Sequence, residues 1–306
     1  MSVNNYQKMN DNFLSYLKSK RYASKSIQSR MNSIRLFWRW LEQENLEVEQ
    51  VSYNDLLLYM KHCSKRMTQK AIKHYMIVIK HFYEHLIKEE RITANPALDI
   101  TVKGVKRKVL YHILEPHELH ALYNNYPITS IQQSRNRVML GMLVYQGLKT
   151  EELGKLEVKD INLREGQITV PGGMRSNGRE MKLEAHQVLD IYDYVLKIRG
   201  ELLQMSSKRI SQTKVETDKL FIGEGGHCQN FSNFMTQLMI KVRQLNPSVL
   251  NAKQIRASVI TKWLKMYNLR EVQYLSGHRY ISSTEWYLEN DLEGLSEEVQ
   301  QFHPLG

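Results

Sequence analysis

The chain has 306 residues, of which 42% are hydrophobic and 25% are charged, and its formal net charge is +11. These values are typical of a folded globular protein of about two domains, and no run of about 18 apolar residues is present that could cross a bilayer. The amino-terminal segment MSVNNYQKMNDNF is polar and lacks the apolar core of a secretory signal, so we expect a cytoplasmic protein with no membrane partner.

The positive charge is concentrated in the first third of the chain. Residues 1–110 contain 20 Lys and Arg against 10 Asp and Glu, whereas residues 111–306 contain 23 against 22. A basic domain of this kind suits a polyanion, because each phosphate that a cation neutralises releases condensed counterions. A merely solvated basic surface is the simpler alternative, and charge alone does not decide between the two.

Four helices are expected in residues 1–102, because apolar residues recur there at steps of three and four. They are expected around residues 13–17, over residues 24–44, over residues 52–66 behind the N-cap Ser52, and from Thr68 to Asn95-Pro96. The result is a small helical domain whose remaining faces carry Lys and Arg. Its candidate DNA-binding residues on the second helix are Arg30, Arg35 and Arg39.

Residues 103–112 are interpreted as a basic interdomain linker. The stretch TVKGVKRKV, residues 101–109, contains a glycine and lacks an apolar stripe. Its cations are candidates to follow a phosphate backbone, namely Lys103, Lys106, Arg107 and Lys108.

The sequence of residues 113–291 predicts a second, mainly helical domain with a small β-hairpin. Helices are expected behind Pro116, over residues 134–147, and at about 187–203, 229–245, 252–266 and 269–277. The apolar period changes to two in QITVP and EMKLE, which flank the turn GGMRSNGR. This turn contains Asn177-Gly178, a strong hairpin signal.

Cationic and nucleophilic side chains follow one another along this second domain. In chain order they are Lys149, Arg175, Lys253, Arg256, His278 and Tyr287. Lys253 and Arg256 are three apart on an expected helix, so both can face one cleft and share one phosphate. Taken singly, each has a simpler interpretation, since surface cations are usually solvated and a tyrosine after a helix usually packs.

Metal and cofactor chemistry is not indicated. Cys63 and Cys228 are far apart, with no C-x-x-C or Cys/His cluster, and the chain has no P-loop and no paired-carboxylate motif. We therefore expect no metal and no cofactor.

Two stretches resemble motifs of the tyrosine recombinases, also called phage integrases. LSGHRYISSTEWY, residues 275–287, resembles L-G-H-x-x-I-x-T-T-x-x-Y, with the same nine-residue step from histidine to tyrosine, and LVYQGLKTEELGKLEVKDIN, residues 143–162, resembles T-G-L-R-x-x-E-L-x-x-L-x-x-x-D-I. The resemblance covers nearly the whole chain. It implies a helical, SAM-like core-binding domain followed by an α+β catalytic domain.

The resemblance also implies roles for individual residues. Tyr287 would be the nucleophile, His278 and Arg256 would bind the phosphate, and Glu152 matches the acidic position that braces the site. Three positions depart from the usual pattern. Lys149 stands where the first catalytic arginine is usual, Lys253 stands where histidine is usual, and Arg175 is the nearest candidate for the lysine of the hairpin turn, with Arg179 and Lys182 as rivals.

These residue types suit attack on a phosphodiester, in which fixed cations stabilise the charge that builds on the non-bridging oxygens. Arg256 can make a two-pronged contact that a lysine cannot, so we expect weaker stabilisation from Lys149. Because a guanidinium keeps its proton, we hypothesise that Arg175 holds the phosphate while Lys253 gives a proton to the departing 5′-oxygen.

The tail, residues 292–306, spaces Leu292, Leu295, Val299 and Phe302 at three, four and three, as in an amphipathic helix. It could pack on its own domain, but in the family such a segment often docks into a neighbouring protomer. We therefore expect a site-specific recombinase that works on double-stranded DNA as a homo-oligomer, from dimer to tetramer, through a 3′-phosphotyrosine. The alternatives are a DNA-binding regulator or accessory factor with a degenerate site, favoured by Lys149, and a monomeric type IB topoisomerase, disfavoured by the tail.

Overall fold

The computed structural model describes residues 3–104, 112–174, 176–205, 217–226 and 231–288. The chain divides into two compact units, Met1–Lys108 and Val109–Gly306, each with its own buried hydrophobic cluster. Three groups of expected features lie outside the described residues: Lys106, Arg107 and Lys108 of the linker, Arg175 of the hairpin, and the tail 292–306. Within the described part, no helix is both long enough and apolar enough to span a membrane.

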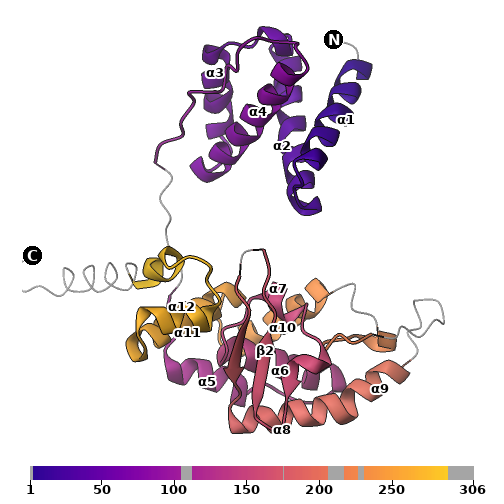
Figure 1. The fold of residues 1–306 in the computed structure, drawn as a ribbon, viewed down its shortest axis with the longest axis vertical. Coiled ribbons are helices and arrows are strands. Elements are labelled where there is room, and N and C mark those ends of the chain that lie inside the picture. Colours follow the sequence, from indigo (N-terminus) through magenta and orange to yellow (C-terminus); the bar gives the residue numbers. More distant parts are fainter. Residues whose placement is uncertain (1–2, 105–111, 175, 206–216, 227–230, 289–306) are drawn as a thin grey trace, which may run out of the picture. The chain divides into compact units, whose positions relative to one another are not determined.

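The described part of the first unit contains four α-helices, as the apolar periodicity predicts (Figure 1). They are α1 (Val3–Ser19), α2 (Ser24–Gln43), α3 (Tyr53–Ser64) and α4 (Gln69–Lys88), with a short 3-10 helix, η1 (Val48–Gln50), before α3. Aromatic rings fill its centre, where Phe82 of α4 packs edge-on against Trp38 of α2, with ring centroids 4.7 Å apart. The expected N-cap is confirmed, because the backbone N–H of Asp55 donates to the Ser52 hydroxyl.

The end of α4 differs from the prediction. The helix stops at Lys88, and Glu90 has a left-handed φ of 57°, so the chain turns well before Asn95-Pro96. Asn95 instead belongs to the loop, where its side chain donates to the carbonyl of Lys80 and accepts from the N–H of Ala97. The prediction from the sequence used Pro96 as the end of the helix. The helix in fact ends earlier, where the backbone becomes left-handed at Glu90.

The second unit contains a three-stranded antiparallel sheet in the order β1-β2-β3, formed by β1 (Ile161–Asn162), β2 (Gln167–Val170) and β3 (Arg179–Lys182). The expected hairpin is confirmed as β2 and β3. Val170 pairs with Arg179, so the two strands are joined by more than two residues, and Asn177-Gly178 lies directly before β3 rather than in a two-residue turn. Arg179 is therefore a strand residue and not a turn residue. The two-residue strand β1 was not expected.

Helices lie beside and below this sheet in the view of Figure 1. They are α5 (Pro116–Asn124), α6 (Ile131–Val144), α7 (Thr150–Leu153), α8 (Ala185–Asp193), the π-helical segment η3 (Tyr194–Ile198), α9 (Arg199–Gln204), α10 (Phe231–Leu245), α11 (Ala252–Met266) and α12 (Leu269–Ser276), with 3-10 helices η2 (Val158–Asp160) and η4 (Glu224–Gly226). The central helix α6 packs against α5, α8 and α11 and is buried on most sides. The mainly helical fold class with a small sheet is confirmed.

Candidate active site

Lys149 is placed by a turn at the end of α6. Gly147 adopts a left-handed φ of 55°, and a Cβ atom there would lie 3.1 Å from Val259 of α11, so the turn both bends and packs closely. Two residues later, Lys149 becomes the N-cap of the single-turn helix α7. Its backbone N–H donates to Oε2 of Glu152 at 2.9 Å, and its ammonium lies 3.9 Å from Oε1 of the same carboxylate.

Arg256 ties three segments of the unit together. It lies on α11 and is buried, with one guanidinium nitrogen donating to the carbonyl of Gly147 and the other donating to the carbonyl of Ser276 at 2.6 Å. Because these acceptors belong to the α6–α7 turn and to the end of α12, the guanidinium is held in one orientation. Burial lowers the pKa of Arg256, while the nearby Glu152 and Tyr287 oppose that shift.

His278 follows α12 directly, after Gly277 ends that helix in the left-handed conformation with φ 63°. Its Nε2 lies 3.3 Å from Nη2 of Arg256, and its Nδ1 lies 2.9 Å from the Thr284 hydroxyl. A guanidinium can only donate, so Nε2 is the acceptor and the ring proton is on Nδ1. Burial and the positive charges of Arg256 and Lys149 lower the pKa of His278 to about 3, so the imidazole is neutral.

Tyr287 stacks on His278, with ring centroids 5.8 Å apart and ring planes at 12°. Its ring packs against the buried core of the same unit, and its side chain is near enough to Arg256 to oppose the lowering of the Arg256 pKa. Tyr287, His278, Arg256 and Lys149 thus meet in one site of one protomer. The sequence analysis predicted these four residues as one site, although Lys149 lies more than a hundred residues before the other three in the chain.

Glu152 and Arg179 form a buried pair beside this group. Arg179 of β3 donates through Nη1 to Oε1 of Glu152 at 3.1 Å and through Nη2 to Oε2 at 3.0 Å, and its side chain has no exposed area. Burial alone would raise the pKa of Glu152, but the hydrogen bonds and charge of Arg179 outweigh burial and lower it. Sequence reasoning treated Arg179 only as a rival for the turn position.

The remaining expected site residues lie elsewhere or outside the description. Lys253 has an exposed side chain that makes no hydrogen bond or ion pair with any described residue, while its backbone N–H binds the N-cap Asn251. Lys182 is exposed on β3, and Arg175 lies outside the described residues. The structure therefore brings Arg256 into the cluster without Lys253. Among the described residues, no group of three or more His, Cys, Asp or Glu is arranged to hold a metal ion.

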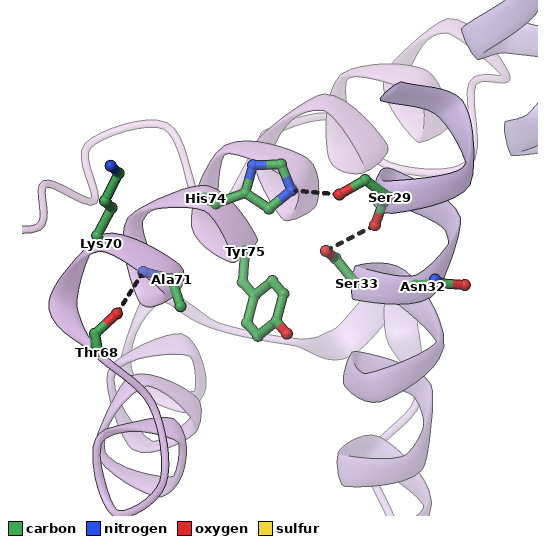
Figure 2. A pocket seen from close by; sticks show the side chains of 8 residues that line it. All are labelled: Ser29, Asn32, Ser33, Thr68, Lys70, Ala71, His74 and Tyr75. Carbon is green, nitrogen blue, oxygen red and sulfur yellow. Dashed lines mark hydrogen bonds between the residues drawn. The ribbon is translucent and has the colours of Figure 1, made fainter. Parts of the chain in front are cut away.

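A second candidate site is an open groove of about 420 Å³ between α2 and α4 of the first unit, with several polar side chains in its lining. Figure 2 shows its lining, in which His74 of α4 faces Ser29 of α2 with Nε2 and the hydroxyl 3.4 Å apart. The lining side chains are Ser29, Asn32, Ser33, Thr68, Lys70, Ala71, His74 and Tyr75. Hydroxyl, amide, imidazole and ammonium groups of this kind can bind phosphates or base edges.

The three arginines expected to bind DNA have different environments. Arg30 is half-buried, with its guanidinium 4.3 Å from the centre of the Tyr22 ring and Nη1 2.6 Å from Nδ1 of His81. Arg35 and Arg39 are exposed on α2, and Lys103 is exposed at the start of the linker. Arg30 thus also supports the unit internally, whereas Arg35 and Arg39 are available to a ligand.

Comparison with known proteins gives consistent results. Residues 112–293 match the family model described as "Phage integrase family", and residues 11–90 match "Phage integrase, N-terminal SAM-like domain". The chain is 24% identical over 311 residues to tyrosine recombinase XerC of Lactobacillus leichmannii, covering 97% of this chain and 99% of that protein. It is 26% identical over 287 residues to tyrosine recombinase XerD of Staphylococcus saprophyticus, covering 89% and 92%.

The solved structures that share its fold include two with TM-scores of about 0.7. One is XerH site-specific recombinase bound to palindromic difH substrate in a post-cleavage complex, with a TM-score of 0.71 and 19% identity over 92% of this chain and 81% of that chain. The other is a lambda integrase dimer bound to a COC' core site, with a TM-score of 0.69 and 14% identity over 93% and 77%.

Proposed function

The chain belongs to the phage integrase family and is a tyrosine-type site-specific recombinase, and from this premise we propose that it cleaves and rejoins double-stranded DNA through a 3′-phosphotyrosine on Tyr287. The observation that carries the proposal is the position of Tyr287, which is stacked on His278, whose Nε2 lies 3.3 Å from the buried Arg256. A tyrosine hydroxyl is thus held beside cations that are fixed before any substrate binds.

The proposed reaction exchanges one phosphoester for another. The Tyr287 oxygen bonds to phosphorus, the bond from phosphorus to the 5′-oxygen breaks, the phenolic proton is lost and a proton is given to the 5′-oxygen. Arg256 and Lys149 face the charge that builds on the non-bridging oxygens, and their fixed positions lower the barrier without reorganisation. Because the bond energy is kept in the phosphotyrosine, rejoining needs no ATP.

The proton for the 5′-oxygen is proposed to come from Lys253, with Arg175 holding the phosphate. Support for Lys253 is its ammonium, a better proton donor than a guanidinium, and its exposure, which leaves it accessible to DNA. Lys149 is the other lysine to consider, since burial and the charge of Arg256 lower its pKa. We assign Lys149 to the phosphate because it lies beside Glu152 and faces the same cluster as Arg256.

Duplex DNA is the proposed substrate, bound by a dimer that assembles to a tetramer. The similar XerH and lambda integrase structures contain DNA, and the latter is a dimer. In this chain, the excess of positive charge in residues 1–110 and the exposed Arg35 and Arg39 favour binding of a polyanion by the first unit.

Covalent capture tests the proposal. The protein is mixed with its native flanking DNA, and a protease-sensitive protein–DNA adduct is expected with the wild type. Tyr287→Phe should abolish the adduct and leave DNA binding within a few-fold, because binding relies mainly on the basic first unit. An adduct with the Phe variant would reject Tyr287 and make the exposed Tyr280 the next residue to test. DNA binding without any wild-type adduct would favour the accessory-factor alternative.

A further inference from the structure

Lys149 and Glu152 have a geometry that their spacing alone does not explain. They are three residues apart at the start of a helix, where the two side chains are neighbours and can form an ion pair. Here the ammonium stays 3.9 Å from Oε1, which is longer than a hydrogen bond, although the Glu152 side chain is only 5% exposed. Some other group must satisfy the buried carboxylate.

That group is Arg179. Its two terminal nitrogens take one oxygen each, at 3.1 and 3.0 Å, and Oε2 also accepts the backbone N–H of Lys149. A planar guanidinium fits a carboxylate in this two-pronged way, which an ammonium cannot do. The carboxylate is therefore occupied by partners other than the Lys149 ammonium.

Charge leads to the same conclusion. Glu152 and Arg179 cancel each other, so among the described residues of this cluster the positive charges left for a phosphate are those of Lys149 and Arg256. Without Arg179, the buried carboxylate would hold the Lys149 ammonium, since an uncompensated buried charge is costly. The cluster would lose one cation at the place where the phosphate binds.

Arg179 also contacts the segment that carries His278. A Cβ atom on Gly277 would lie 2.4 Å from Nη1 of Arg179, and the N–H of Asn177 donates to the Gly277 carbonyl at 3.1 Å. The first residue of β3 is thus packed between the α7 turn and the end of α12. Its side chain is completely buried, so it acts through these neighbours and not by touching DNA.

We propose that Arg179 is a positioning residue: by occupying both oxygens of Glu152, it keeps the Lys149 ammonium available for the scissile phosphate. The proposal rests on the proposed function. It explains how the chain works with a lysine where its motif resembles one with arginine. Arg179, which lies in β3, provides the guanidinium that binds Glu152. The Lys149 ammonium therefore remains available to bind the phosphate.

A double-mutant cycle tests this role. Arg179→Met should slow adduct formation on the order of 100-fold with DNA binding within a few-fold, because the freed carboxylate draws Lys149 away from the phosphate. Glu152→Gln added to Arg179→Met removes that competitor and should recover at least about 10-fold of the lost rate. Arg179→Lys keeps the positive charge but cannot make the two-pronged contact with Glu152. Its rate of adduct formation should fall between those of Arg179→Met and the wild type.

The control is Arg137→Met, which removes an arginine of the same unit that is only partly buried and is paired with Asp190 at 2.8 Å. It should change thermal stability and leave the rate of adduct formation within about 3-fold. If Arg179→Met fails to fold, the double variant is compared with the wild type instead, since removing both buried charges is tolerated better than removing one. A rate within about 10-fold of the wild type supports the role, and a larger loss overturns it.

Where Arg179→Met folds, two results would overturn the inference. One is a folded Arg179→Met variant that cleaves at the wild-type rate, and the other is a double variant no faster than Arg179→Met. Absence of an adduct with the wild type would instead refute the proposed function, so the two failures are distinguishable.

Discussion

His278 is held neutral in the free protein because it is buried among cations, which lower its pKa to about 3. We expect its imidazole to remain unprotonated from about pH 8 down to about pH 5, and NMR titration of the ring carbons would show this. Binding of a phosphate anion should raise its pKa, because negative charge favours the protonated ring. A titration of His278 near its usual 6.5 in the free protein would contradict the structure.

The same lowered pKa makes stability depend on pH. An unfolded chain binds a proton at His278 as pH falls below about 6.5, while the folded chain does not until about 3. Stability is therefore fully present above about 6.5 and is lost progressively as pH falls toward 3. Denaturant unfolding should show a steeper loss for the wild type than for His278→Gln over this range. Equal slopes would indicate that the histidine is not desolvated.

The proton donor can be identified with DNA whose bridging 5′-oxygen is replaced by sulfur, since a thiolate leaves without a proton. Lys253→Ala should be slowed on the order of 100-fold on normal DNA and cleave the sulfur substrate at close to the wild-type rate. Lys149→Ala and Arg175→Ala should be slow on both substrates, because we expect them to bind the phosphate. Rescue of either of these by sulfur, and not of Lys253→Ala, would assign the proton to that residue instead.

At the scale of elements, the sequence predicted what depends on local pattern. The helices α2, α5, α11 and α12 follow from apolar stripes and caps, and the step from His278 to Tyr287 is readable within one short segment. The sequence failed where long-range pairing decides. The sequence analysis placed Arg179 in the turn, but in the structure it pairs with Val170 and lies in β3. The helix α7 has a single turn, which is too short to show the spacing of apolar residues that identifies a helix. The contact between Arg179 and Glu152 had no local signal at all.

Gly277 is a position where backbone conformation and packing make separate demands. Its φ of 63° disfavours any side chain, and a Cβ would also meet the Arg179 guanidinium at 2.4 Å. Gly277→Ala should therefore reduce adduct formation well beyond its loss of stability, because it displaces the partner of Glu152.

Gly166→Ala is the matched control. Gly166 has nearly the same φ, 61°, but its Cβ would meet only Val188 at an ordinary 3.7 Å. It should cost about 1 kcal/mol of stability and leave the rate per folded molecule unchanged. Comparable loss of rate in both variants would mean that strain alone, and not the displaced guanidinium, causes the defect.

The face formed by α2 and the α2–α4 groove is proposed to bind the DNA backbone. Arg35→Ala and Arg39→Ala should each weaken binding several-fold and reduce the slope of log affinity against log salt by about 1. Arg30→Ala should mainly lower the melting temperature, because its guanidinium stacks on Tyr22. The control Arg164→Ala removes an exposed charge between β1 and β2. An equal loss in this control would point to net charge rather than to α2.

At the scale of the whole molecule, charge and chemistry are divided between the two units. The first unit carries the excess of basic residues, while the second carries the residues of the candidate active site with almost balanced charge. Binding and cleavage should therefore be separable by mutation. This division is visible in the sequence alone, because it needs only a count of charges and the positions of the motifs.

Assembly is the last property that the sequence predicts, through the apolar stripe of Leu292, Leu295, Val299 and Phe302. A chain that ends at Asp291 should bind a single site normally and fail to form complexes that join two sites, because the stripe is expected to lie on a neighbouring protomer. Light scattering and native gels with two-site DNA measure this. Leu295→Ser and Phe302→Ser should reproduce the defect, while Gln301→Ser, off the stripe, should not. Full assembly by the shortened chain, or loss of single-site binding, would place the tail on its own unit, where it would support folding and not synapsis.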